Sequence, residues 1–130
     1  ERLAVSLDSG DQEDEHSCFS DNTTNDIIAN AVGIQNVLLA TYPGGVTGTS
    51  FYDVFAAKDK AAADRLKAEV AASVAAAGTI AAPFDQWLRE GVADDAPGRQ
   101  AILKTMDDLS TQTDSLVAAA KSIGISIAVS

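Results

Sequence analysis

The amino-acid sequence predicts an all-α protein, an up-and-down four-helix-type bundle that forms a single domain. Of its 130 residues, 46% are hydrophobic and only 5% are aromatic, and much of the hydrophobic share is alanine, the best helix former. In three long segments the apolar residues recur at spacings of three and four, as on one face of a helix. The length suits one domain, and no low-complexity linker divides it.

The chain opens with a short amphipathic segment and an acidic loop. Residues Glu1–Ser9 place Leu3, Val5 and Leu7 in the alternation of a strand, although the end of a helix explains so short a segment equally well. Gly10–Asn22 is polar and dense in acidic residues, as expected of a loop. The amphipathic opening and the lack of an initiator Met lead us to expect a fragment or a chain cut from a longer precursor.

The first long helix is expected over Thr23–Tyr42. Its apolar positions follow at spacings of four, three, four and four: Ile27, Ala31, Ile34, Leu38 and Tyr42. Asp21 or Asn22 can cap its N-terminus, because either side chain can accept a hydrogen bond from a free backbone N–H. Pro43 and the two glycines after it are expected to end the helix.

The second helical region is expected to begin at Ser50, which with Asp53 has the spacing of a capping box. The alanine-rich run Ala56–Ala82 follows, and its small side chains allow neighbouring helices to approach closely. Its apolar positions at helical spacing are Ala62, Leu66, Val70, Val74, Ala77 and Ile80. A short helix is expected over Pro83–Glu90, since proline fits a first turn but not a helix interior.

The last helix is expected over Ala96–Val129, with Asp95 as its cap and Pro97 in its first turn. Its apolar positions alternate spacings of four and three: Ile102, Met106, Leu109, Thr113, Leu116, Ala120, Ile123 and Ile127. Gly124 is able to end this helix early. An isolated coiled coil has the same pattern, but three long helices joined by loops favour a bundle.

The charge of the chain excludes some partners. Nine basic and 19 acidic residues give a formal net charge of −10, which argues against binding nucleic acid or an anionic membrane surface. Cations, basic partners or simple solubility remain open. No run of about 18 apolar residues is present, so we expect no transmembrane segment.

One dense group of chemically active side chains precedes the first long helix. We select His16, Glu13, Glu15, Cys18 and Asp21 as candidate metal ligands. Carboxylates suit hard cations, imidazole suits iron or zinc, and thiolate suits softer metals. Glu13 and His16 also have the Glu-x-x-His spacing of di-iron bundles, although such a site needs two pairs. The alternative is a solvated acidic loop that leads to a helix cap, with Cys18 as a small hydrophobic residue.

Catalytic patterns fit the sequence poorly, and we assign no catalytic residue. A single histidine excludes any site that needs two, including His-Glu-x-x-His zinc sites. His16 adjoins Ser17 and Cys18, but neighbours in sequence seldom point at each other as a nucleophile and base must.

Residues Gln12–Thr23 resemble the signature of imelysin-like proteins, the insulin-cleaving membrane protease family. The resemblance continues through Asn30–Val37, Pro83–Gln86 and the final helix. It implies a two-bundle protein of which residues 1–130 are the C-terminal domain, with the N-terminal half absent from this chain. It also implies a location in the periplasm or at the outer membrane and a role in bacterial iron uptake.

The resemblance further implies a site near the interface of the two domains. The family's Gly-x-His-x-x-Glu motif belongs to the N-terminal half and is absent here, and Thr24 stands where a second histidine is usual. We therefore expect this chain to supply half of a site for iron, another divalent metal or an iron carrier, completed by an N-terminal imelysin-like domain of the same or a separate chain. The alternatives are a metallopeptidase completed by that missing half, and a helical interaction scaffold without metal.

Overall fold

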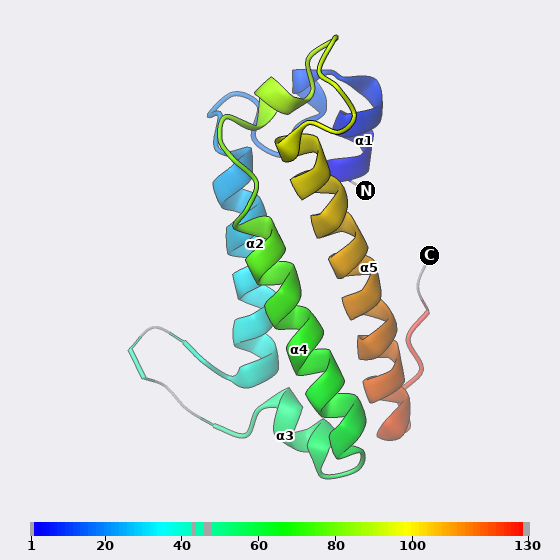
Figure 1. Cartoon of the computed structure of the whole chain (residues 1–130). Coiled ribbons are helices and arrows are strands. Elements are labelled where there is room, and N and C mark those ends of the chain that lie inside the picture. Colours follow the sequence, from blue (N-terminus) through cyan, green and yellow to red (C-terminus); the bar gives the residue numbers. More distant parts are fainter. Residues whose placement is uncertain (1, 43, 46–47, 129–130) are drawn as a thin grey trace.

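The computed structural model describes residues 2–42, 44–45 and 48–128, and this part of the chain is helical with no β-strand (Figure 1). Its elements, with the 3₁₀ helices labelled η, are α1 (Arg2–Ser9), η1 (Gln12–Asp14), α2 (Thr23–Leu39), α3 (Phe51–Ala56), α4 (Lys60–Ala77), η2 (Phe84–Trp87) and α5 (Pro97–Ser122). The all-α prediction is confirmed. Glu1, Pro43 and Val129, which belonged to predicted segments, lie outside the described residues.

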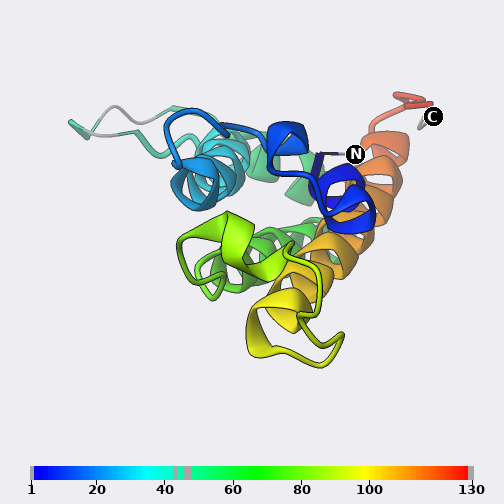
Figure 2. The same ribbon diagram turned by 90° about the horizontal axis from the view of Figure 1, so that it is seen from above.

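The three long helices form the body of the bundle. α2, α4 and α5 run alternately down, up and down, and α4 packs against both of the others (Figure 1). α2 and α5 make little direct contact with each other. α1 lies beside the first turns of α5, and α3 packs at the opposite end of α4 (Figures 1 and 2). Within the described residues, the space between α2 and α5 on the side away from α4 therefore has no fourth long helix.

Small side chains bring α4 and α5 close together. Ser73 and Ala77 of α4 and Thr105 and Ala119 of α5 are fully buried. The hydroxyl groups of Ser73 and Thr105 donate to carbonyl oxygens one turn earlier in their own helices, at 3.1 and 2.8 Å, so their burial leaves no unpaired polar group. The alanine-rich composition of α4 thus produces a close helix pair, as predicted.

The larger apolar side chains gather in two clusters, one toward each end of the bundle. The cluster beside α1 and η2 consists of Leu7, Ile27, Ala31, Ala77, Ile80, Phe84, Leu88 and Ile102. The cluster beside α3 consists of Leu38, Phe55, Ala63, Leu66, Val70 and Ala119. In the part of the chain that the structure describes, none of the helices has the length and hydropathy needed to cross a bilayer.

The face that α5 turns toward α4 differs from the predicted one. Ile102 and Ala120 of the predicted seam are buried, but Met106, Leu109, Thr113 and Leu116 between them are half-buried or exposed. The buried positions of α5 are Gly98, Ile102, Thr105, Gln112, Ser115, Ala119 and Ala120. The reason is steric, because the close approach of α4 favours short side chains at the contact. The larger apolar side chains of α5 are consequently displaced toward the α2 side.

The helical region predicted from Ser50 through Ala82 is in fact two helices, α3 and α4. α3 ends at Ala56, and Asp59 then caps α4 by accepting a hydrogen bond from the backbone nitrogen of Ala62 at 3.0 Å. The alanine-rich pattern concealed this break, because aspartate is also common on helix surfaces. The first segment is also settled, since α1 is a helix and not a strand.

Two predicted side-chain caps are wrong. α2 begins after Asn22 without a side-chain cap, and the Asn22 amide instead donates to the Asp26 carboxylate at 2.9 Å. α5 begins after Ala96 rather than after Asp95, also without a side-chain cap. In both cases the helix start was predicted to within a residue or two, but the cap was assigned to the wrong group.

Other helix ends agree with the sequence. The capping box is confirmed, because Ser50 Oγ accepts from the Asp53 nitrogen and Asp53 Oδ2 accepts from the Ser50 nitrogen, both at 3.0 Å. Pro97 occupies the first turn of α5. α5 ends at Ser122, before Gly124, whose φ of +82° places it in the left-handed region that favours glycine.

Candidate functional site

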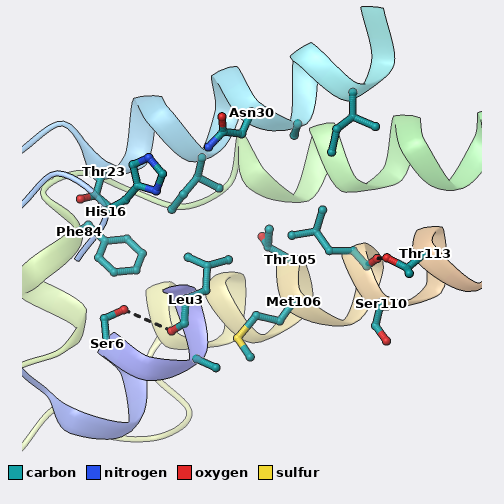
Figure 3. Close-up of a pocket in the computed structure, with 15 residues that line it drawn as sticks. Leu3, Ser6, His16, Thr23, Asn30, Phe84, Thr105, Met106, Ser110 and Thr113 are labelled. Atoms are coloured by element: carbon teal, nitrogen blue, oxygen red, sulfur yellow. Dashed lines mark hydrogen bonds between the residues drawn. The ribbon is translucent and has the colours of Figure 1, made fainter. Parts of the chain in front are cut away.

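A cavity of about 520 Å³ lies between α1, α2 and α5 (Figure 3). Its apolar lining consists of Leu3, Ala4, Ile27, Ala31, Ile34, Phe84, Met106 and Leu109. Its polar lining consists of Ser6, His16, Thr23, Asn30, Thr105, Ser110 and Thr113. An apolar cavity with a few convergent polar groups is the usual character of a ligand site between the helices of a bundle.

The cavity follows from the way the long helices pack. α2 supplies Ile27, Ala31 and Ile34, which lie on one face because they are four and three residues apart. α5 supplies Met106 and the residues of its displaced apolar face. Since both helices pack on α4 and scarcely touch each other, their side chains do not fill the space between them.

His16 lies at the loop end of this cavity. Figure 3 shows its imidazole beside Thr23 and Phe84, at the opposite end from Thr113. The ring comes from the segment between η1 and α2, and the residue is exposed. It is thus available both to the cavity and to a group that approaches from outside.

Hydrogen bonds fix the segment that carries His16 to the first turn of α2. The backbone nitrogen of Ser17 donates to Thr23 Oγ1 at 3.1 Å, and the Ser17 hydroxyl donates to Asp26 Oδ2. The Asn22 amide occupies the other oxygen of the Asp26 carboxylate. Asp26 therefore holds the two ends of the segment together, and the position of His16 is preorganised.

Glu15 is buried immediately next to His16. Its side chain is only 3% exposed, and among the described residues neither carboxylate oxygen has a partner with normal hydrogen-bond geometry. Burial raises the pKa of Glu15, and the nearby charges of Asp85 and Asp21 raise it further, while the Thr23 hydroxyl lies close enough to offset part of the rise. A buried carboxylate without hydrogen-bond partners is poorly solvated, so binding a proton or a cation stabilises it.

A second buried polar group lies in the first turn of α2. The hydroxyl of Thr24 is buried and has no hydrogen-bond partner among the described residues. Thr24 is also the position at which the resemblance implied a histidine. Unsatisfied buried polar groups are uncommon in folded proteins, so two within the loop end of α2 mark this region as different from an ordinary core.

The five candidate ligands do not converge in this chain. Glu13 and Asp21 are exposed, Cys18 is a half-buried free thiol, and only His16 lines the cavity. Within the described residues no three His, Cys, Asp or Glu side chains are placed to hold one metal ion. Their contribution of half a metal site therefore stays a prediction that depends on groups from elsewhere.

Sequence reasoning missed most of the cavity. Asn30, Ser110 and Thr113 are polar residues within or beside apolar helical stripes. Polar residues in such a stripe could have indicated the cavity, because a helix face that packs fully into the core usually lacks polar side chains without partners. The burial of Glu15 had no such signal, since it sits among exposed acidic residues.

We expect Glu15→Gln to stabilise the protein at neutral pH. A carboxyl group whose pKa is raised by folding contributes most below its ordinary value of 4.5, and the contribution is lost as the pH rises through the folded pKa. The amide has no charge to bury, so at about pH 7 we expect the variant to gain about 1 kcal/mol in the free energy of unfolding. The difference should disappear near pH 4, as measured by urea unfolding at both pH values.

The control for Glu15 is Glu13→Gln, which removes the same charge from an exposed position on η1. It should change stability little at either pH. An equal gain in both variants would show that general acidic repulsion, and not the burial of Glu15, is responsible.

Comparison with known proteins assigns this chain to a family. The family model described as Imelysin (Peptidase_M75) matches residues 1–116. No curated protein matches the chain. The match includes α1, the acidic segment, α2, α4 and most of α5, and therefore every residue that lines the cavity.

Proposed function

We propose that this chain, which belongs to the imelysin family, is a non-catalytic binding module of a bacterial iron-uptake protein in the periplasm or at the outer membrane. Its cavity supplies half of a site for iron or an iron carrier. An N-terminal imelysin-like domain, in the same protein or in a separate chain, supplies the other half and covers the cavity.

The observation that supports this proposal is that His16 lines the open cavity and directly follows Glu15, whose buried carboxylate oxygens have no hydrogen-bond partner among the described residues. Imidazole and carboxylate are ligands that iron accepts. The two groups are fewer than a closed metal site needs, and His16 is an exposed residue that a second domain can reach. Glu13, Cys18 and Asp21 lie on the same segment and are the further candidates on this side of the interface.

The test is His16→Ala in a protein that carries both domains. Iron affinity, measured by titration calorimetry, should fall by roughly 10- to 100-fold, the loss seen when groups that support a metal site are removed. The control is Asp14→Asn, which alters an exposed residue of η1 outside the candidate set. Unchanged iron affinity in a folded His16→Ala variant would contradict the proposed role.

The same protein separates the proposal from its alternatives. Peptide cleavage that a chelator abolishes would identify a metallopeptidase instead of a binding module. A melting temperature that iron leaves unchanged would favour a scaffold without metal, since a specific ligand raises the stability of the state that binds it.

A further inference from the structure

The apolar lining of the cavity continues along α2 and α5 beyond the cavity itself. Ile34 lines the cavity and Val37 follows one turn later, yet their side chains are 42% and 51% exposed. On α5, Leu116 lies three residues after the cavity-lining Thr113 and is 37% exposed. Residues three or four apart share a helix face, so these side chains extend one apolar groove between the two helices.

The shape of this groove fits an α-helix. α2 and α5 lie on either side of α4, and the side of their pair opposite α4 is open between α1 at one end and α3, which contacts both helices, at the other (Figure 2). Two helices packed on a third present ridges spaced three and four residues apart, which a further helix can fill with residues at the same spacing. Peptide recognition by a helix in a groove uses this pattern of anchors.

Exposed acidic residues lie beside the groove on α5. Asp107 and Asp114 lie three and four residues from the cavity-lining Ser110, whereas Asp26 on α2 is engaged by Ser17 and Asn22. Residues 3–57, which include α2, α3 and all of α1 except its first residue, Arg2, contain eight acidic residues and no Lys or Arg. Lys104 of α5 is paired with Asp108 and is not available to neutralise this edge.

We infer that the groove binds an amphipathic α-helix with an apolar stripe flanked by Lys or Arg side chains. The apolar anchors pack between Ile34, Val37 and Leu116, and the basic flank on the α5 side faces Asp107 and Asp114. A second copy of this chain is a poor occupant, because each copy carries a net charge of −10. We build this on the proposed function, in which a second domain covers the cavity, but binding of the helix needs no iron.

The probes are two labelled peptides of about 20 residues, enough for five turns of helix. They share one Leu/Ala stripe and carry either Lys or Glu along its flanks. Fluorescence anisotropy should show at least roughly tenfold tighter binding of the Lys peptide, and the preference should shrink as salt screens the charges. Equal binding of the two peptides overturns the inference.

Variants of the protein locate the binding. Ile34→Glu and Leu116→Glu should each weaken binding of the Lys peptide by about tenfold or more. The matched control is Val54→Glu on α3, where the side chain is similarly exposed at 41% and binding should not change. Equal losses in all three variants would place the peptide elsewhere and overturn the inference.

A double variant with milder substitutions tests the inference even if the glutamate variants unfold. Asp107→Asn combined with Asp114→Asn changes only exposed side chains, and it should reduce both the affinity for the Lys peptide and its salt dependence. Unchanged affinity overturns the charged part of the inference.

A dimer in light scattering that Ile34→Glu dissociates would show that a second copy fills the groove. Failure of peptide binding leaves the iron titration of His16→Ala interpretable by itself, because the peptide test contains no metal.

Discussion

Replacing Gly98 by alanine is expected to lower the free energy of unfolding by about 3 kcal/mol, a large effect for one methyl group. A Cβ atom at this position would lie 2.0 Å from Cδ2 and 2.1 Å from Cε2 of Trp87. The indole ring therefore lies directly against the backbone of the first turn of α5. It is held there by a hydrogen bond from its Nε1 to the Ala81 carbonyl oxygen at 2.8 Å. The ring must leave this position before the methyl group fits.

The measurement uses the fluorescence of Trp87, the only tryptophan in the sequence, together with circular dichroism during urea unfolding. In a Trp87→Leu background the same glycine replacement should be much less destabilising, so the two changes should not be additive. The matched control is Gly33→Ala on α2, where an added Cβ meets nothing within 4 Å. It should stabilise the helix by roughly 0.5–1 kcal/mol. Additive effects would contradict the steric explanation.

Phe84→Ala is expected to lower the free energy of unfolding by about 3–5 kcal/mol. Phe84 is almost completely buried and belongs to the core cluster that joins Leu7 of α1, Ile27 of α2 and Ile102 of α5. It also forms the wall of the cavity next to His16 (Figure 3). Its removal would join a void in the core to the cavity, so that α1 and the segment before α2 lose their support. Thermal and urea unfolding measure the loss.

A small aromatic molecule tests whether the space left by Phe84 behaves as a cavity. Toluene should raise the melting temperature of the alanine variant more than that of the unaltered protein, because it can occupy the vacated apolar space. Phe51→Ala is the control, since Phe51 is exposed on α3 and its loss should change stability by no more than about 0.5 kcal/mol. A loss at Phe84 as small as that at Phe51 would contradict its place in the core.

The sequence was sufficient for the helical class and for most helix positions, because these depend on local patterns. The spacing of Ile27, Ala31 and Leu38 and the capping box at Ser50 are properties of a few neighbouring residues. The rotation of α5 is not, because it depends on how closely α4 approaches. A regular seam from Met106 to Leu116 looked like a core face, but the alanines of α4 made the small residues beside it the better contact.

The candidate site was predictable only in part. The single imidazole in an acidic segment was conspicuous, and the structure places His16 at a cavity. The other wall, with Ser110 and Thr113 of α5, is more than 90 residues away in the sequence and meets His16 only through the packing of three helices. The burial of Glu15 was equally hidden, because the acidic residues before it, Glu13 and Asp14, are exposed and no local pattern separates it from them.

The unequal packing of the long helices gives the groove one stiff side and one compliant side. α5 is clamped to α4 along small, fully buried residues, whereas α2 shares a less extensive contact with α4 and little with α5. A molecule that binds between them contacts the firmly packed α5 on one side and the less firmly packed α2 on the other. We therefore expect the width of the opening to depend on the position of α2, and because Asp26 ties the His16 segment to the first turn of that helix, we expect the imidazole to shift together with it.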